Sequence, residues 1–235
     1  MNLTKDTWTK KDYKDFINYL FSIKEEKYKD FQQKIIPNKK IIGIKTNILK
    51  KIAKEIYKGN YKDFLSIIEN NYYEENLLYG LILTNIKDIN ILLPYLNKYV
   101  LIIDNWASCD LTISNLKIVK NNKEIFFTYI LDNINNNHSY TRRFGYVLLL
   151  NCYIEKEYLN KIFKLCNIPN NDYYVNMSIA WLISMCYIKY KDETLNYLNN
   201  NKLNKFTYNK TIQKIIESNQ VSKEEKNILK TMKIN

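Results

Sequence analysis

The sequence predicts an all-α protein, and two observations support this prediction. The 235 residues include only 4 glycines and 3 prolines, whereas strands joined by hairpins need turn glycines. Apolar residues recur at helical spacing along most of the chain, and no stretch gives a convincing strand pattern. Hydrophobic residues make up 46% of the chain and charged residues 26%, a balance typical of a globular protein. A chain of this length can bury a core as one domain or as one repeat array.

Glycines and capping residues mark the third expected helix of the chain, which follows Gly43. Gly43 fits a tight entry to this helix, and Thr46 or Asn47 is expected to cap it. We expect it to end at Gly59, since glycine commonly follows the last helical turn. The other helices are expected at about residues 9–24, 25–35, 61–69, 74–86, 88–98, 104–120, 123–132, 157–166, 172–189, 193–200, 208–218 and 222–232, with a further helix that begins near residue 139.

The spacing of these helices predicts a repeat architecture. A helix pair recurs about every 35 to 45 residues, which is the spacing of HEAT-like repeats. Such repeats stack into a curved right-handed α-solenoid with a concave binding face. We therefore expect one helical-repeat domain over residues 1–235 that acts as a monomer. The alternative is a compact, irregular helical bundle.

The charge of the chain favours a polyanionic partner. The net charge is +12, and a basic protein of this size is often a nucleic-acid binder because neutralising phosphates releases counterions. A compositional bias towards lysine is the alternative explanation. We expect DNA on the concave face, no membrane span, no signal peptide and a cytoplasmic location.

The cysteines and the single histidine argue against a metal site. Cys109, Cys152, Cys166 and Cys186 lie far apart, and His138 is the only histidine. No Cys-x-x-Cys spacing occurs, so neither a metal nor another cofactor is expected. The cysteines are expected to be free thiols in a reducing compartment.

The two arginines are adjacent in a chain that otherwise uses lysine. Of 36 basic residues only Arg142 and Arg143 are arginines, and a guanidinium is a planar fork suited to phosphate or carboxylate. Ser139 as an N-cap would place both in the first turn of a helix, beside backbone donors that favour an anion. The alternative is a structural salt bridge. The two side chains point about 100° apart on a helix, so one of them can be structural.

The segment from Asp104 to Asp110 places an acid on an apolar stripe. Trp106 and Asp110 are four positions apart, so they share one face of the expected helix with Ile113. A carboxylate on such a stripe needs a partner or a chemical role. Asp104 is expected to be the N-cap of this helix.

A second tryptophan lies on another helical stripe. Trp181 aligns with Tyr174, Met177, Met185 and Ile188. This stripe is either plain core or an aromatic wall of a binding site. Trp8 precedes the first helix and receives no role.

Six segments follow one another along the chain: residues 28–38 (YKDFQQKIIPN), 42–46 (IGIKT), 105–110 (NWASCD), 142–145 (RRFG), 180–181 (AW) and 206–214 (FTYNKTIQK). Together they resemble the DNA alkylation repair family, the AlkD-like DNA glycosylases with a HEAT-like fold. The resemblance covers about residues 28–233. No one of these motifs is highly specific, and their order along one helical chain carries the resemblance.

The resemblance implies a function and a set of site residues. Members of the family excise cationic N3- and N7-alkylated purines from double-stranded DNA without flipping the base. It implies that Asp110 is the catalytic carboxylate and that Trp106 and Trp181 pack against the deoxyribose. Arg142 or Arg143 matches the arginine that holds the DNA backbone near the lesion.

These roles agree with the chemistry of the residues, with one departure. A carboxylate stabilises a developing sugar oxocarbenium ion, and aromatic faces favour a cation. The better-known members carry an arginine three positions after the second tryptophan, whereas this chain has Ser184. Two alternatives are therefore a non-catalytic DNA-binding module and a protein-interaction scaffold of the same fold.

Overall fold

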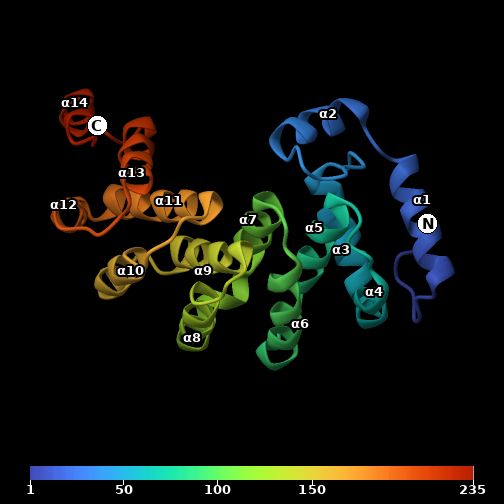
Figure 1. The fold of residues 1–235 in the computed structure, drawn as a ribbon. Coiled ribbons are helices and arrows are strands. Elements are labelled where there is room, and N and C mark those ends of the chain that lie inside the picture. Colours follow the sequence, from blue (N-terminus) through green and yellow to red (C-terminus); the bar gives the residue numbers. More distant parts are fainter. Residues whose placement is uncertain (235) are drawn as a thin grey trace. The chain divides into compact units, whose positions relative to one another are not determined.

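The computed structural model describes residues 1–234, which form fourteen α-helices and two short 3₁₀ helices, with no strand among these residues (Figure 1). The helices are α1 (Lys10–Ser22), α2 (Glu26–Ile35), α3 (Thr46–Lys58), α4 (Tyr61–Ile67), α5 (Tyr73–Leu83), α6 (Ile89–Ile102), α7 (Trp106–Asn115), α8 (Lys123–Ile134), α9 (Ser139–Cys152), α10 (Leu159–Cys166), α11 (Tyr173–Lys189), α12 (Lys191–Asn199), α13 (Lys205–Glu217) and α14 (Lys223–Thr231), with 3₁₀ helices η1 (Lys117–Asn121) and η2 (Lys156–Tyr158). The all-α prediction is confirmed.

The helices belong to two compact units, Met1–Asn121 and a second that begins at Asn122. In the first unit α3 packs on α5 and α5 on α7, while α4 packs on α3 and α6 on α5. In the second unit α9 packs on α11 and α11 on α13, while α8, α12 and α14 pack on these three helices in turn. Alternate helices thus form a row within each unit, which is the packing of a helical-repeat, α-solenoid fold. The organisation as one domain and the handedness of the array stay predictions.

The amino-terminal helix is fixed by an aromatic cluster. Trp8 is 5% exposed and its ring meets Phe64 edge-on at a centroid distance of 4.9 Å. Phe16 lies 5.2 Å from Phe64, also edge-on. Edge-on pairs at these distances stabilise a core beyond the area that they bury. Trp8 is therefore a core residue.

The entry to α3 is built around one glycine and one buried acid. Gly43 has φ of +110°, a conformation that side-chain-bearing residues rarely adopt. The carboxylate of Glu74, itself fully buried, accepts hydrogen bonds from the N–H groups of Ile42 (2.9 Å), Gly43 (2.7 Å) and Ile44 (3.2 Å). Three successive N–H groups that converge in this way form an anion-binding nest. This nest ties the start of α5 to the loop before α3.

Some expected helix ends are wrong, and the structure supplies the reason. Lys45, not Thr46 or Asn47, is the N-cap of α3 and makes no side-chain capping bond. The segment expected to be helical to about residue 120 stops as α-helix at Asn115 and continues as η1. The Asn115 side-chain amide donates to the Leu111 carbonyl at 2.6 Å. A side-chain donor therefore binds a carbonyl oxygen of the last turn, in competition with the backbone N–H that would continue the helix. The predicted end of α3 at Gly59 is confirmed.

No helix among the described residues has the length and apolar character that crossing a bilayer requires.

Candidate active-site helices

The helix α7 has one face that is bonded to the rest of its unit. Ser108 and Thr112, one turn apart, are both fully buried. The Tyr99 hydroxyl of α6 donates to the Ser108 carbonyl (3.2 Å) and shares a hydrogen bond with the Thr112 hydroxyl (2.9 Å). Burial raises the pKa of Tyr99 well above its usual value, so this hydroxyl keeps its proton. These contacts fix the rotation of α7 about its axis.

The opposite face of α7 carries the tryptophan and the acid. At about 100° per residue, Trp106 and Asp110 lie within about 40° of each other, and about 120–160° from Ser108 and Thr112. Both are half-buried, whereas Ala107, Ser108 and Cys109 between them are buried. Trp106 and Asp110 therefore point away from α5 and α6. Ile113, the third member of the predicted stripe, is 2% exposed and belongs to the core.

A glycine on α5 allows α7 to approach closely. A Cβ added at Gly80 would lie 2.0 Å from the Thr112 hydroxyl oxygen and 2.5 Å from the Tyr99 hydroxyl oxygen. Both distances are far shorter than van der Waals contact. This role of Gly80 was not predicted from the sequence, although a glycine inside an apolar helical run is a signal of close packing.

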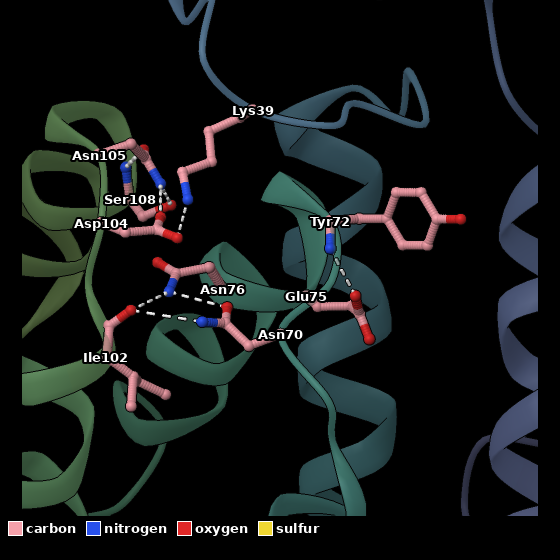
Figure 2. Close-up of polar contacts among 9 residues, drawn as sticks. All are labelled: Lys39, Asn70, Tyr72, Glu75, Asn76, Ile102, Asp104, Asn105 and Ser108. Carbon is pink, nitrogen blue, oxygen red and sulfur yellow. Dashed lines mark hydrogen bonds and ion pairs between the residues drawn. The ribbon is translucent and has the colours of Figure 1, made fainter.

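The amino terminus of α7 is capped by Asn105 (Figure 2), which corrects the prediction for Asp104. The Asn105 side-chain oxygen accepts from the Ser108 N–H at 2.8 Å, and its amide donates to the Ser108 hydroxyl at 3.0 Å and to Asp104. Asp104 instead forms an ion pair with Lys39. Two polar residues were available at this helix start, and Asp104 is drawn to a cation 65 positions away in the chain. Asn105 is therefore free to cap.

A second polar contact in Figure 2 holds the end of α6. The Asn76 amide donates to the carbonyl of Ile102 (2.9 Å) and to the side-chain oxygen of Asn70 (2.9 Å). Asn70 has φ of +62° and its own amide also reaches the Ile102 carbonyl at 3.3 Å. Because α6 leads directly into α7, this bonding supports the position of Trp106 and Asp110 from the preceding turn.

Trp181 lies on the least buried stripe of α11. Tyr174, Met177, Trp181 and Ile188 are half-buried and Met185 is 37% exposed. The residues around Trp181 (Ile179, Ala180, Leu182 and Ile183) are buried. The stripe is therefore not fully buried core, and part of the Trp181 side chain stays exposed.

The adjacent arginines have different environments. Arg143 is 6% exposed and its guanidinium donates to the Tyr174 carbonyl at 2.8 Å. Tyr174 lies two turns before Trp181 on the same face of α11, so Arg143 joins the start of α9 to the helix that carries Trp181. Arg142 is half-buried, and its Nε–H is buried without a hydrogen-bond partner in the described chain.

The amino terminus of α9 is capped by His138, not by Ser139 as predicted. The His138 ring nitrogen accepts from the Thr141 N–H at 3.3 Å. The Ser139 hydroxyl donates to the carboxylate of Asp172 at 2.7 Å, and Asp172 is itself the N-cap of α11. Asp172 draws Ser139 away from the capping position and links the two helix starts. The prediction that both arginines lie in the first turn of a helix holds for Arg142, the fourth residue of α9, and is wrong for Arg143, the fifth residue, because the helix begins one position earlier than predicted.

The position at which the better-known family members carry an arginine is structurally committed here. Ser184 is 4% exposed and its hydroxyl donates to the Trp181 carbonyl at 2.7 Å. Ser184 is neutral and its hydroxyl is bonded within its own helix, so it does not supply the positive charge that an arginine would supply at this position.

The four cysteines, all within residues 1–234, form no disulfide; three are buried and Cys152 is half-buried. Burial raises the pKa of Cys186 to about 12 and that of Cys166 well above the usual value, so these thiols stay protonated and unreactive. Within residues 1–234, no group of three or more histidine, cysteine or acidic side chains is placed to hold a metal ion.

The structure is that of a helical-repeat protein. Trp106 and Asp110 on α7 and Trp181 on α11 are half-buried. The model of a family described as DNA alkylation repair enzyme matches residues 19–215. The chain belongs to the DNA alkylation repair enzyme family, and DNA is the substrate that this family implies. A search of curated proteins finds no match to the chain.

Proposed function

We propose that this protein is a DNA glycosylase that releases cationic N3- and N7-alkylated purines from double-stranded DNA without flipping the base. One observation carries the proposal: Trp106 and Asp110 lie on the face of α7 opposite the bonded Ser108 and Thr112. A half-buried carboxylate on this helix face, in a chain of the DNA alkylation repair enzyme family, supports a role beside a cationic nucleotide.

In the proposed reaction the bond between C1′ and the purine nitrogen breaks. Its electron pair moves to the cationic base, which leaves as a neutral molecule, so no strong general acid is needed. The sugar becomes an oxocarbenium ion, and Asp110 stabilises this positive charge electrostatically. Water then adds to C1′ and gives its proton to Asp110 or to solvent. The products are the free alkylpurine and an abasic site.

The aromatic rings supply the other half of the proposed site. Trp106 and Trp181 pack against the deoxyribose of the damaged nucleotide, and their faces favour the same cation. Their half-exposed positions on α7 and α11 support this role. Arg143 holds the DNA backbone near the lesion, since its bond to the Tyr174 carbonyl orients the guanidinium on the Trp181 helix. Arg142 contributes positive charge.

Duplex DNA that carries a single 7-methylguanine tests the proposal. We expect the protein to convert it to an abasic product, which heating in alkali turns into a strand break visible on a gel. A duplex with unmodified guanine at the same position is the control. No product above the level of the control would falsify the glycosylase proposal.

A second candidate function is a non-catalytic DNA-binding module. The buried, internally bonded Ser184 favours it, because a cation of the better-known glycosylases is missing from this position. This candidate predicts salt-dependent duplex affinity without release of the base, so the same gel separates the two.

Arg143→Lys is expected to slow excision at least about tenfold. One lysine ammonium cannot both donate to the Tyr174 carbonyl and present a planar fork to phosphate, and a lost charge-assisted hydrogen bond of about 1.5–3 kcal/mol corresponds to tenfold or more in rate. Arg142→Lys is the matched control and should stay within about threefold. Single-turnover rates on 7-methylguanine DNA, with melting curves of both variants, measure the difference. A larger loss in Arg142→Lys would reverse the assignment of the two arginines.

A further inference from the structure

Five aromatic rings follow one another along the amino-terminal ends of α9, α11 and α13. They are His138, Tyr140, Tyr174, Tyr173 and Phe206, and we refer to them as the aromatic row. Successive ring centroids lie 6.2, 5.3, 5.2 and 5.7 Å apart. These separations fall within the range of direct aromatic contact. The row therefore runs unbroken over three helices of one unit.

The outer end of the row is exposed. Tyr173 is 54% exposed and Phe206 is 38% exposed, whereas the other three rings are half-buried. Burial raises the pKa of Tyr140 well above its usual value, so this ring stays neutral. Two large rings that touch each other on the surface form an apolar platform.

Phe206 lines two hollows. One has a volume of about 390 Å³ and is lined by Asn171, Tyr173, Asn176, Asn204, Lys205 and Phe206. The other has a volume of about 600 Å³ and is lined by Lys205, Phe206, Asn209, Lys210, Gln213 and Lys233. Both volumes lie in the range of ligand pockets, about 300–1,000 Å³. A planar ring bound in either hollow would have both an aromatic side chain and side-chain amide groups beside it.

The charge around this end of the row is positive. Residues 199–213 include Lys202, Lys205 and Lys210 and no acid. None of these three lysines forms an ion pair within the described part of the chain, and the Lys210 ammonium lies 5.8 Å from the Phe206 ring centroid. Asp172, the acid beside Tyr173, has its carboxylate engaged by the Val175 N–H and the Ser139 hydroxyl. A ligand at Phe206 would meet cations.

We propose that the aromatic row binds unpaired nucleotides of single-stranded DNA, with bases stacked on Tyr173 and Phe206 and phosphates near Lys205 and Lys210. Exposed aromatic rings interleaved with lysines are the means by which proteins hold single strands, because every base has a stacking face. Paired bases of a duplex already use both faces, so the row selects unpaired DNA. DNA is the nucleic acid on which the family acts. This binding activity is separate from the proposed excision.

Binding of tailed and blunt duplexes tests the inference. A fluorescein-labelled duplex with a tail of ten thymidines and the same duplex without the tail are titrated with the protein, and anisotropy is measured. The tailed duplex should bind at least about fivefold more tightly, since each stacked base is worth about 1–3 kcal/mol and 1.4 kcal/mol is tenfold. A 2-aminopurine placed in the tail should lose fluorescence on binding, because stacking quenches it.

The double variant Tyr173→Ala/Phe206→Ala should remove the advantage of the tail and the quenching. Tyr173→Phe should retain both, because it keeps the ring. Phe21→Ala is the matched control, since Phe21 is also 38% exposed and lies on α1 in the other unit. Lys205→Gln should lower the slope of log affinity against log salt by about 0.7, the value for one single-strand phosphate contact.

Equal affinity for tailed and blunt DNA, or an unchanged tail advantage in the double variant, would overturn the inference. A tail of ten uridines that binds more tightly than the DNA tail would overturn the choice of DNA. Excision of 7-methylguanine from the blunt duplex should be the same in wild type and double variant. A failure of excision in both proteins contradicts the proposed function and leaves the tail comparison to decide this inference.

Discussion

Replacing Asp110 with asparagine is expected to slow release of 7-methylguanine at least about a hundredfold, while duplex affinity stays within about threefold. The amide keeps the shape of the carboxylate and removes its charge. Removing one preorganised electrostatic group from an active site costs about 10²–10³ in rate, and the oxocarbenium ion is the charged species that Asp110 faces in the proposed reaction. Single-turnover cleavage and anisotropy on the same duplex measure the two quantities.

Asp104→Asn is the matched control for this variant. Asp104 is also a half-buried acid at the start of α7, and it pairs with Lys39 and Asn105. The same chemical change six positions earlier should leave the excision rate within about threefold, because a partly exposed ion pair contributes about 0–1 kcal/mol. Excision by Asp110→Asn at more than a tenth of the wild-type rate would refute the catalytic assignment.

Replacing Glu74 with glutamine is expected to destabilise the first unit by about 2–4 kcal/mol. The amide oxygen can keep part of the nest, but the side-chain NH₂ then faces a buried N–H donor, and a buried donor without an acceptor costs about 1–3 kcal/mol. The remaining bonds also lose their charge assistance. For a chain of this size about 1 kcal/mol corresponds to about 2–4 °C in melting temperature, so thermal unfolding should begin roughly 5–15 °C earlier.

Glu75→Gln provides the comparison at the neighbouring position. Glu75 is 1% exposed, and its carboxylate accepts from the Tyr72 N–H at 2.6 Å. Burial raises the pKa of this carboxyl, so its surroundings favour an uncharged side chain, and one amide oxygen is enough for the bond. We expect a shift of less than half that of Glu74→Gln. Equal shifts in circular-dichroism melts would show that the nest has no special role.

Local sequence signals predicted the helices well where one residue could serve as a cap. Asp88, Asp172 and Ser222 each begin an expected helix, and each accepts a backbone N–H at the start of α6, α11 and α14. The same signals failed at Asp104 and Ser139. There a neighbour caps the helix because Lys39 and Asp172 bind the expected residue, and these partners lie 65 and 33 positions away.

The candidate site was predictable in part. The spacing of Trp106 and Asp110 predicted their shared face, which the burial pattern of α7 confirms. The pattern of α11 could not separate a core stripe from a ligand-facing stripe, because both consist of aromatic and apolar residues. Arg143 donates to a backbone carbonyl, and a pattern of side chains in the sequence cannot predict such a contact. The catalytic and DNA-binding roles of these residues stay predictions.

The absence of a side chain at Gly80 determines how closely α7 packs against α5. The hydrogen atom of Gly80 lets the Thr112 and Tyr99 hydroxyls occupy the space where any other residue would place a carbon. The position of Asp110 therefore depends on Gly80 of α5, a residue that need not contact DNA. Gly80→Ala would add one methyl group and displace α7. The Asp110 carboxylate would keep its chemistry, but its position relative to the DNA would change.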